Sequence, residues 1–339
     1  MLKFYKSAFI VTFLACCGGF YLGGLAGLWA VLILSVLEVS LSFDNAVVNA
    51  SVLKTWGPLW RKRFLMWGMP IAVFGMRLVF PLLIVGVVGH LSPWGAVELA
   101  VRSPADYSKL LISAHPQIAA FGGTFLMMVF LKFFLNEQKE EHWLHWIEVP
   151  LTKMARFTEV FVLSLLLISA SFMPASEKFV FVAAGVIGLI VFLVVETIGS
   201  LMEGTDATST STSRVVKEGI GGLLYLEVLD ASFSFDGVIG AFALSSDIFI
   251  IALGLGVGAM FVRSMTLMLL EKGTMVQFRY LEHGAFWAIG ALAAIMFIGT
   301  HVKVPEAVTG LIGALAIGAA IWSSSRANKL DARTQSPVG

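Results

Sequence analysis

The stretch Glu38-Val-Ser-Leu-Ser-Phe-Asp44-Asn45 places two carboxylates inside a long apolar segment. A second stretch, Asp230-Ala-Ser-Phe-Ser-Phe-Asp236-Gly237, repeats this pattern in the other half of the chain. In both, an acid is followed by Ser-Phe-Asp starting four residues later and then by a small or polar residue. Glu227 adds a further acid one helical turn before Asp230. This repeat is the feature from which fold and function are predicted.

The segments around the repeat are apolar enough to lie in lipid. Of the 339 residues, 58% are hydrophobic and 13% are charged, the latter about half the usual share in a soluble globular chain. Mean hydropathy is +0.88. The adjacent Cys16 and Cys17 indicate no disulfide framework, and no basic block indicates nucleic-acid binding. The composition therefore predicts an all-α, polytopic membrane helix bundle.

A helix crosses the hydrocarbon layer in about 20 apolar residues, and this length predicts ten spans. Their expected ranges are 8–28, 30–53, 64–89, 117–135, 159–174, 178–201, 219–243, 247–270, 284–301 and 304–322. The first is interpreted as a retained helix, because it is longer than a signal-peptide core and no small-x-small cleavage site follows it. The 90–116 segment is expected to be an external loop, and the 136–158 segment an internal amphipathic one.

The basic residues orient these spans. With the N-terminus in the cytoplasm, 17 of the 23 Lys and Arg residues fall inside, 4 fall outside, and Arg77 and Arg263 lie within spans. Positively charged loops remain on the cytoplasmic side. The pattern predicts that both termini are cytoplasmic.

The two motifs lie on the second and seventh spans. An offset of five spans makes them run in opposite directions, which is typical of an inverted repeat with its site near the midplane. The expected organisation is a first repeat over 1–175 with motif helix 30–53, a second repeat over 176–325 with motif helix 219–243, and a cytoplasmic tail over 326–339.

The acids of the motifs predict a cation site. Buried carboxylates are costly in a membrane, at roughly 2.5–3.5 kcal/mol each, and five of them exceed the two span arginines, Arg77 and Arg263, expected to pair with them. The remainder requires protons or a bound cation. Oxygen donors favour Mg²⁺, Ca²⁺ or Mn²⁺ over soft metals. The predicted metal ligands are Glu38, Asp44, Asn45, Glu227, Asp230 and Asp236.

Helical spacing limits how these ligands converge. Residues six apart on a helix point about 120° away from each other, so Glu38 and Asp44 cannot share one narrow face. Either the cavity is wide or the Ser-Phe-Asp segment is partly unwound, which Gly237 makes plausible in the second repeat. Glu196, in the sixth span, has no counterpart and is a weaker candidate for a role in ion or proton passage.

Around these residues the chain resembles a known family. Glu38-x-x-x-Ser-Phe-Asp44-Asn45, followed by Arg61-Lys-Arg, Trp67-Gly68 and Arg77, is similar to the TerC family of integral membrane proteins. So is Glu227-x-x-Asp230-x-x-Phe-Ser-Phe-Asp236 with the later Arg263-Ser264. The resemblance covers roughly 30–90 and 219–272, and it departs at Asp236-Gly237-Val-Ile, where the family is expected to have Asp-Ser-Ile-Pro.

The resemblance implies manganese export, a link to tellurium resistance, a place among LysE-type exporters and location in the bacterial inner membrane. Together the residues and the resemblance predict a transporter, not an enzyme, that exports a divalent cation in exchange for protons, with Mn²⁺ the first candidate. A membrane-embedded assembly factor that delivers metal to other proteins is the alternative. An intramembrane aspartic hydrolase is disfavoured, because the arginines would keep the aspartates ionised. No resident cofactor is expected; the expected partners are the bilayer and the metal ion, with homo-oligomerisation left open.

Overall fold

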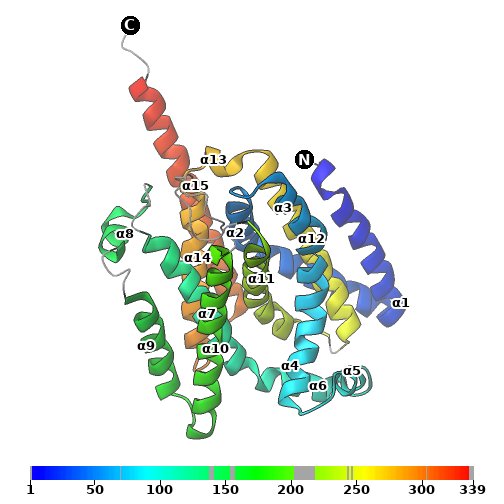
Figure 1. The fold of residues 1–339 in the computed structure, drawn as a ribbon. Helices are drawn as coiled ribbons and strands as arrows, with labels where there is room; N and C mark the ends of the chain where they lie inside the picture. The colour runs from blue at the N-terminus through cyan, green and yellow to red at the C-terminus, as the bar shows by residue number, and fades with distance from the viewer. Residues whose placement is uncertain are drawn as a thin grey trace.

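The regular secondary structure of the protein is helical. The computed structural model describes residues 2–68, 70–136, 141–152, 157–201, 218–242, 244–245, 247–302 and 304–335. No β-strand occurs among these residues, so the predicted all-α class is confirmed for them. Figure 1 shows a bundle whose central helices are surrounded by others on all sides of the view.

The helices of the first part of the chain are short or interrupted, apart from α1, α7 and α10. They are α1 (Leu2–Leu41), α2 (Phe43–Leu53), α3 (Pro58–Arg63), the π-helices η1 (Phe64–Gly68) and η2 (Ile71–Val79), α4 (Phe80–Val88), α5 (Pro93–Arg102), α6 (Pro104–Ser113), α7 (His115–Phe134), α8 (His145–Thr152), α9 (Thr158–Ser171) and α10 (Ala175–Leu201).

The rest of the chain forms longer helices. They are α11 (Ile220–Ala241), α12 (Ile248–Glu271), the short α13 (Thr274–Gln277), α14 (Leu281–Gly299) and α15 (Glu306–Gln335). The helix α15 continues through most of the segment expected to be a tail, and it projects beyond the bundle (Figure 1).

Six helices of the described residues are long and apolar enough to cross a membrane, or seven if the pair Gly75–Val88 and Pro93–Arg102, bent by 105°, counts as one span. The count of ten stays a prediction. The first expected span falls within α1, and the second begins in α1 and ends with α2; α1 departs from helical geometry at Gly23 and at Gly24, where φ is +60°. Another, α9, has only 14 residues, and α11 carries three acids.

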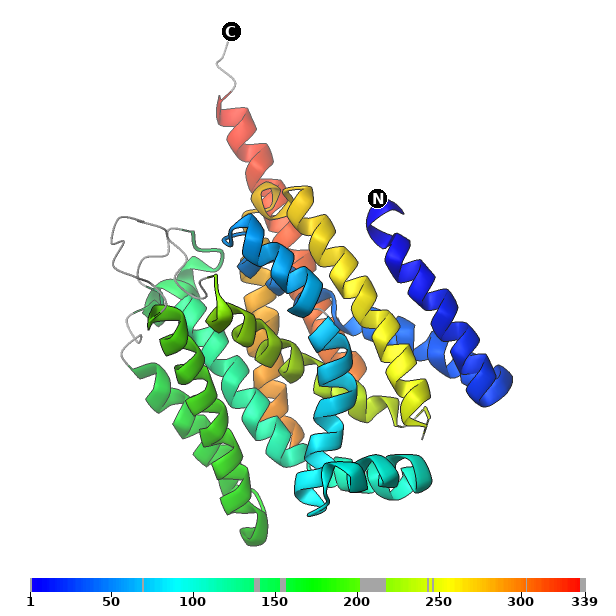
Figure 2. The ribbon, with the colours of Figure 1, turned by 45° about the vertical axis from the view of Figure 1, so that its right-hand side comes forward.

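The two termini lie at the same end of the bundle (Figures 1 and 2), whereas α5 and α6 lie at the opposite end. This arrangement agrees with an even number of crossings and with a 90–116 segment on the side away from the termini. The expected loop is built of helices, each of which begins with a proline, Pro93 or Pro104. Proline suits the first turn, where its missing N–H would have no helical partner.

Glycines let α12 approach the α1 segment that carries the motif. A Cβ added to Gly254 would lie 2.6 Å from Leu34 Cβ, and one added to Gly258 would lie 2.2 Å from Glu38 Cγ and 2.4 Å from Glu38 Cβ. Atoms cannot approach so closely without displacement. Because lipid gives no hydrophobic drive to helix association, such close backbone packing is a main source of stability. Gly258 therefore fixes where Glu38 lies.

We expect Gly258→Ala to lower the thermal stability of the purified protein, because the added methyl group forces α1 and α12 apart. Overpacking of this kind costs about 1–3 kcal/mol. The matched control is Gly318→Ala in α15, where an added Cβ meets nothing within 4 Å. Alanine favours a helix over glycine by about 1 kcal/mol, so the control should unfold at the same temperature or higher. Equal melting temperatures for the two variants in detergent would contradict this packing.

Candidate cation site

The first motif lies at a break between two helices. Ser42 separates α1 from α2 and has φ −107° and ψ 17°, outside helical values. The backbone N–H of Asn45, in the first turn of α2, donates to Asp44 Oδ1 at 3.0 Å. The second motif is different, because α11 runs unbroken through Gly237. The interpretation that Gly237 marks an unwound segment in the second repeat is therefore wrong, and the interruption belongs to the first.

Arg77 joins the two motifs. Its guanidinium forms an ion pair with Glu38 of α1, and its other terminal nitrogen lies 3.5 Å from Asp230 Oδ2 of α11. Arg77 is 2% exposed, Glu38 3% and Asp230 6%, so the three charges are buried together. One cation between two carboxylates leaves this group with an excess negative charge. Ser42 also donates to Glu38, through Oγ to Oε1 at 3.2 Å.

The contacts between the motifs are mirrored. Asn45 Nδ2 donates to Asp230 Oδ1, and a Cβ added to Gly237 would lie 3.1 Å from Glu38 Oε2. The repeat aligns Glu38 with Asp230 and Asn45 with Gly237, so the second contact is the first with the two repeats exchanged. The early residue of each motif faces the late residue of the other. Two segments that pair in this way run in opposite directions where they cross.

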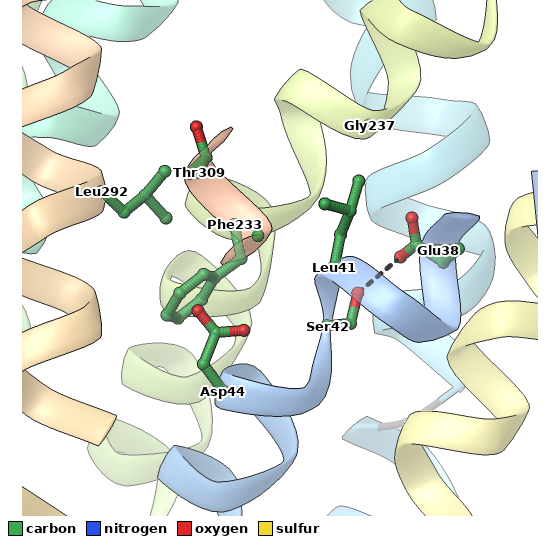
Figure 3. A pocket seen from close by; sticks show the side chains of 9 residues that line it. Glu38, Leu41, Ser42, Asp44, Phe233, Gly237, Leu292 and Thr309 are labelled. Atoms are coloured by element: carbon green, nitrogen blue, oxygen red, sulfur yellow. Dashed lines mark hydrogen bonds between the residues drawn. The ribbon is translucent and has the colours of Figure 1, made fainter. Parts of the chain in front are cut away.

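A cavity of about 40 Å³ adjoins this crossing. Figure 3 shows Asp44 extending into it from α2, with Thr309 of α15 on its far side and the Ser42–Glu38 hydrogen bond along one wall. Its lining residues are Glu38, Leu41, Ser42, Asp44, Phe233, Gly237, Leu292, Thr309 and Gly310. At 10–15 Å³ per water, it has room for roughly three water molecules. A divalent ion would enter only after losing most of its hydration shell.

Among the other predicted ligands, Asn45, Glu227 and Asp230 do not line this cavity. Glu227 is 4% exposed, and neither of its carboxylate oxygens has a hydrogen-bond partner among the described residues. A Cβ added to Gly68 of η1 would lie 2.9 Å from Glu227 Oε1. Asp236 belongs to α11, and its side chain lies outside what the structure describes. Within the described ranges, no three His, Cys, Asp or Glu side chains form a group that could hold a metal ion.

The two span arginines are not equivalent. Unlike Arg77, Arg263 makes no ion pair with any described residue, and it is partly exposed. Glu196, the weaker candidate for ion passage, lies 3.2 Å from Lys132, which also lies 3.6 Å from Glu159. Lys132 of α7 thus contacts both α9 and α10, and it is the ion-pair partner of Glu196.

Sequence reasoning missed a polar residue of the cavity and a buried polar residue on the helix that carries Asp44. Thr309 lies in the last predicted span but outside both motifs, so no repeat pattern indicated it. Asn49 is 2% exposed, and its Oδ1 has no hydrogen-bond partner in the described part of the chain. It follows Asn45 by one helical turn, and residues four apart share a helix face, so this spacing could have identified it.

The chain was compared with known proteins. No curated protein matches it, and no solved structure does. A family model matches residues 43–331, which is most of the chain and includes Asp44, Arg77 and the second motif. The chain therefore belongs to the family described as "Protein of unknown function (DUF475)".

Proposed function

We propose that the protein is a membrane transporter that exports a divalent metal cation, first of all Mn²⁺, in exchange for protons. The observation that carries the proposal is an excess of buried acid at the crossing of the two motifs. Glu38, Glu227 and Asp230 contribute three buried carboxylates and Asp44 a partly buried one, and Arg77 is the one cation paired with them among the described residues. Such an excess in a membrane bundle is expected where ions or protons pass.

The chemistry of the cavity favours a hard cation. Its polar lining consists of carboxylate and hydroxyl oxygens from Glu38, Ser42, Asp44 and Thr309, and oxygen ligands suit Mn²⁺, Mg²⁺ and Ca²⁺. Few fixed ligands and a small volume also suit a cargo, since a transported ion must bind weakly enough to leave again. The TerC-like motifs add manganese as the first candidate within this set.

The proposed architecture is ten spans in two inverted repeats, with both termini in the cytoplasm of a bacterial cell. The mirrored contacts Asn45–Asp230 and Gly237–Glu38 support the inverted relationship. Termini at one end of the bundle support an even number of spans (Figure 1). A site at the crossing of the repeats, near the midplane, is where alternating access from the two sides is possible.

Inside-out vesicles from cells that produce the protein should accumulate Mn²⁺ when their interior is acidic, because proton exit would drive metal entry. Dissipating the pH gradient should stop the uptake, and cells without the protein should contain more manganese and tolerate less of it. Metal content of the vesicles is measured by mass spectrometry, with vesicles lacking the protein as the control. Uptake of Zn²⁺ or Cu⁺ without Mn²⁺, or no uptake of any divalent ion, would contradict the proposal.

A further inference from the structure

The two repeats differ at one position of the crossing. Asn45 of the first motif places its amide against Asp230 and donates a hydrogen bond to it. The second motif has Gly237 at the aligned position, so no side chain stands against Glu38. The space that an amide fills on the Asp230 side is therefore left open on the Glu38 side.

The cavity lies on that open side. Both Glu38 and Gly237 line it, whereas Asn45 and Asp230 do not (Figure 3). A Cβ on Gly237 would approach Glu38 Oε2 to 3.1 Å, closer than ordinary van der Waals contact, and would occupy the gap between the carboxylate and α11. The glycine thus keeps the carboxylate open to the cavity.

Glu38 presents one oxygen to this space. Its Oε1 is engaged by Arg77 and by Ser42, whereas its Oε2 makes no hydrogen bond within the described residues. The residue is only 3% exposed, so this oxygen faces the interior of the bundle and not open solvent. Arg77 holds the carboxylate in place through one oxygen and leaves the other to bind a ligand.

We propose that the protein has a single, one-sided cation site on the Glu38 side of the crossing, in the space that Gly237 leaves where its counterpart is an asparagine. The ligands are Glu38 Oε2 and the Asp44 carboxylate, with water completing the coordination. The Asp230 side is closed, because Asn45 and Arg77 already engage its carboxylate. This inference rests on the proposed transport function and assigns its substrate to one half of the repeat.

The test is a titration of the purified full-length protein with MnCl₂ by calorimetry. Wild type should bind one Mn²⁺ per chain. Gly237→Ala should weaken binding by about threefold, and Gly237→Asn, which recreates the closed side, by at least about tenfold, or about 1.4 kcal/mol. Asn45→Gly should still bind one Mn²⁺, since it leaves Glu38 and Asp44 in place. Gly318→Ala, with nothing within 4 Å of the added methyl group, should bind as wild type does.

Thermal unfolding distinguishes filling of the space from loss of the fold. The 3.1 Å contact is with the end of one side chain and alanine is the better helix former, so Gly237→Ala should remain folded while it binds Mn²⁺ more weakly. If Gly237→Asn does not fold, the Mn²⁺ affinity of Gly237→Ala tests the inference. Wild-type affinity in a folded Gly237→Ala or Gly237→Asn protein, or no Mn²⁺ binding by wild type, would overturn the inference.

The transport function and the one-sided site are tested by different measurements. Equal Mn²⁺ transport by vesicles with glycine, alanine or asparagine at position 237 would support the transport function and contradict the one-sided site. If wild type binds one Mn²⁺, the Gly237→Asn variant does not, and neither transports metal, the results would support the one-sided site and contradict the transport function.

Discussion

Membranes that contain the Arg77→Gln variant should hold far less folded protein than wild-type membranes. Glu38 and Asp230 are buried and share this guanidinium, so glutamine leaves two carboxylates without a cation in the bundle interior. Removing one partner of a buried ion pair costs about 3–5 kcal/mol, which is a large part of the 5–15 kcal/mol that stabilises a typical protein. The measurements are the amount in the membrane by blot and the melting temperature in detergent.

Arg263→Gln is the matched control. Arg263 is the same residue type in the other half of the chain, but it forms no ion pair with a described residue and is partly exposed. We expect a wild-type level and melting temperature. Adding Glu38→Gln to Arg77→Gln should recover part of the lost stability, because it removes one of the two uncompensated charges. Equal losses from Arg77→Gln and Arg263→Gln would show that the two arginines contribute similarly to the fold.

The second large effect is expected at Asp44, where transport should be lost without loss of protein. Asp44 lines the cavity and accepts a hydrogen bond from the Asn45 backbone, but it has no ion pair among the described residues. The substitution Asp44→Asn keeps the shape of the side chain and removes the charge that attracts a divalent cation. We expect metal uptake by inside-out vesicles to fall by at least about tenfold, the change that 1.4 kcal/mol of lost affinity produces.

Asp230→Asn makes the same chemical change at a carboxylate that forms an ion pair with Arg77. It removes one of the two carboxylates that hold Arg77, so its main effect should be a lower melting temperature. Normal transport by a normally abundant Asp44→Asn protein would remove Asp44 from the mechanism. The sequence predicts loss of transport for Asp236→Asn as well, and that variant tests a side chain outside the described residues.

Much of the helix pattern was predictable from the sequence. Long apolar runs located α7, α10, α12 and α14 to within a few residues, because membrane helices are selected by length and hydropathy. The helices of the 90–116 segment were harder to predict, since α5 and α6 are short. Two prolines in the segment indicated a loop more strongly than its amphipathic pattern indicated helices. The sequence favoured a helix break at Gly237, because glycine has conformational freedom, but the structure has the break at Ser42. The position of a break also depends on the helices packed around it.

The site was predictable only in part. The repeat predicted that the acids of the two motifs lie together, and of these the structure brings Glu38 and Asp230 together through Arg77. It could not separate Arg77 from Arg263, although Arg77 follows Asp44 by 33 residues and Arg263 follows Asp236 by 27. That difference, together with the π-helices η1 and η2, gives the two arginines different positions along their helices. Thr309 enters the cavity from α15 only through tertiary packing.

The break at Ser42 gives the site an electrostatic preference that belongs to the backbone. A helix carries a dipole, with partial negative charge at its last carbonyl groups and partial positive charge at its first N–H groups. The end of α1 therefore adds negative potential beside Glu38, and the start of α2 stabilises the negative charge of Asp44. The unbroken α11 offers no such ends. The backbone therefore favours a cation on the Glu38 side of the break, whereas on the other side the start of α2 keeps Asp44 ionised.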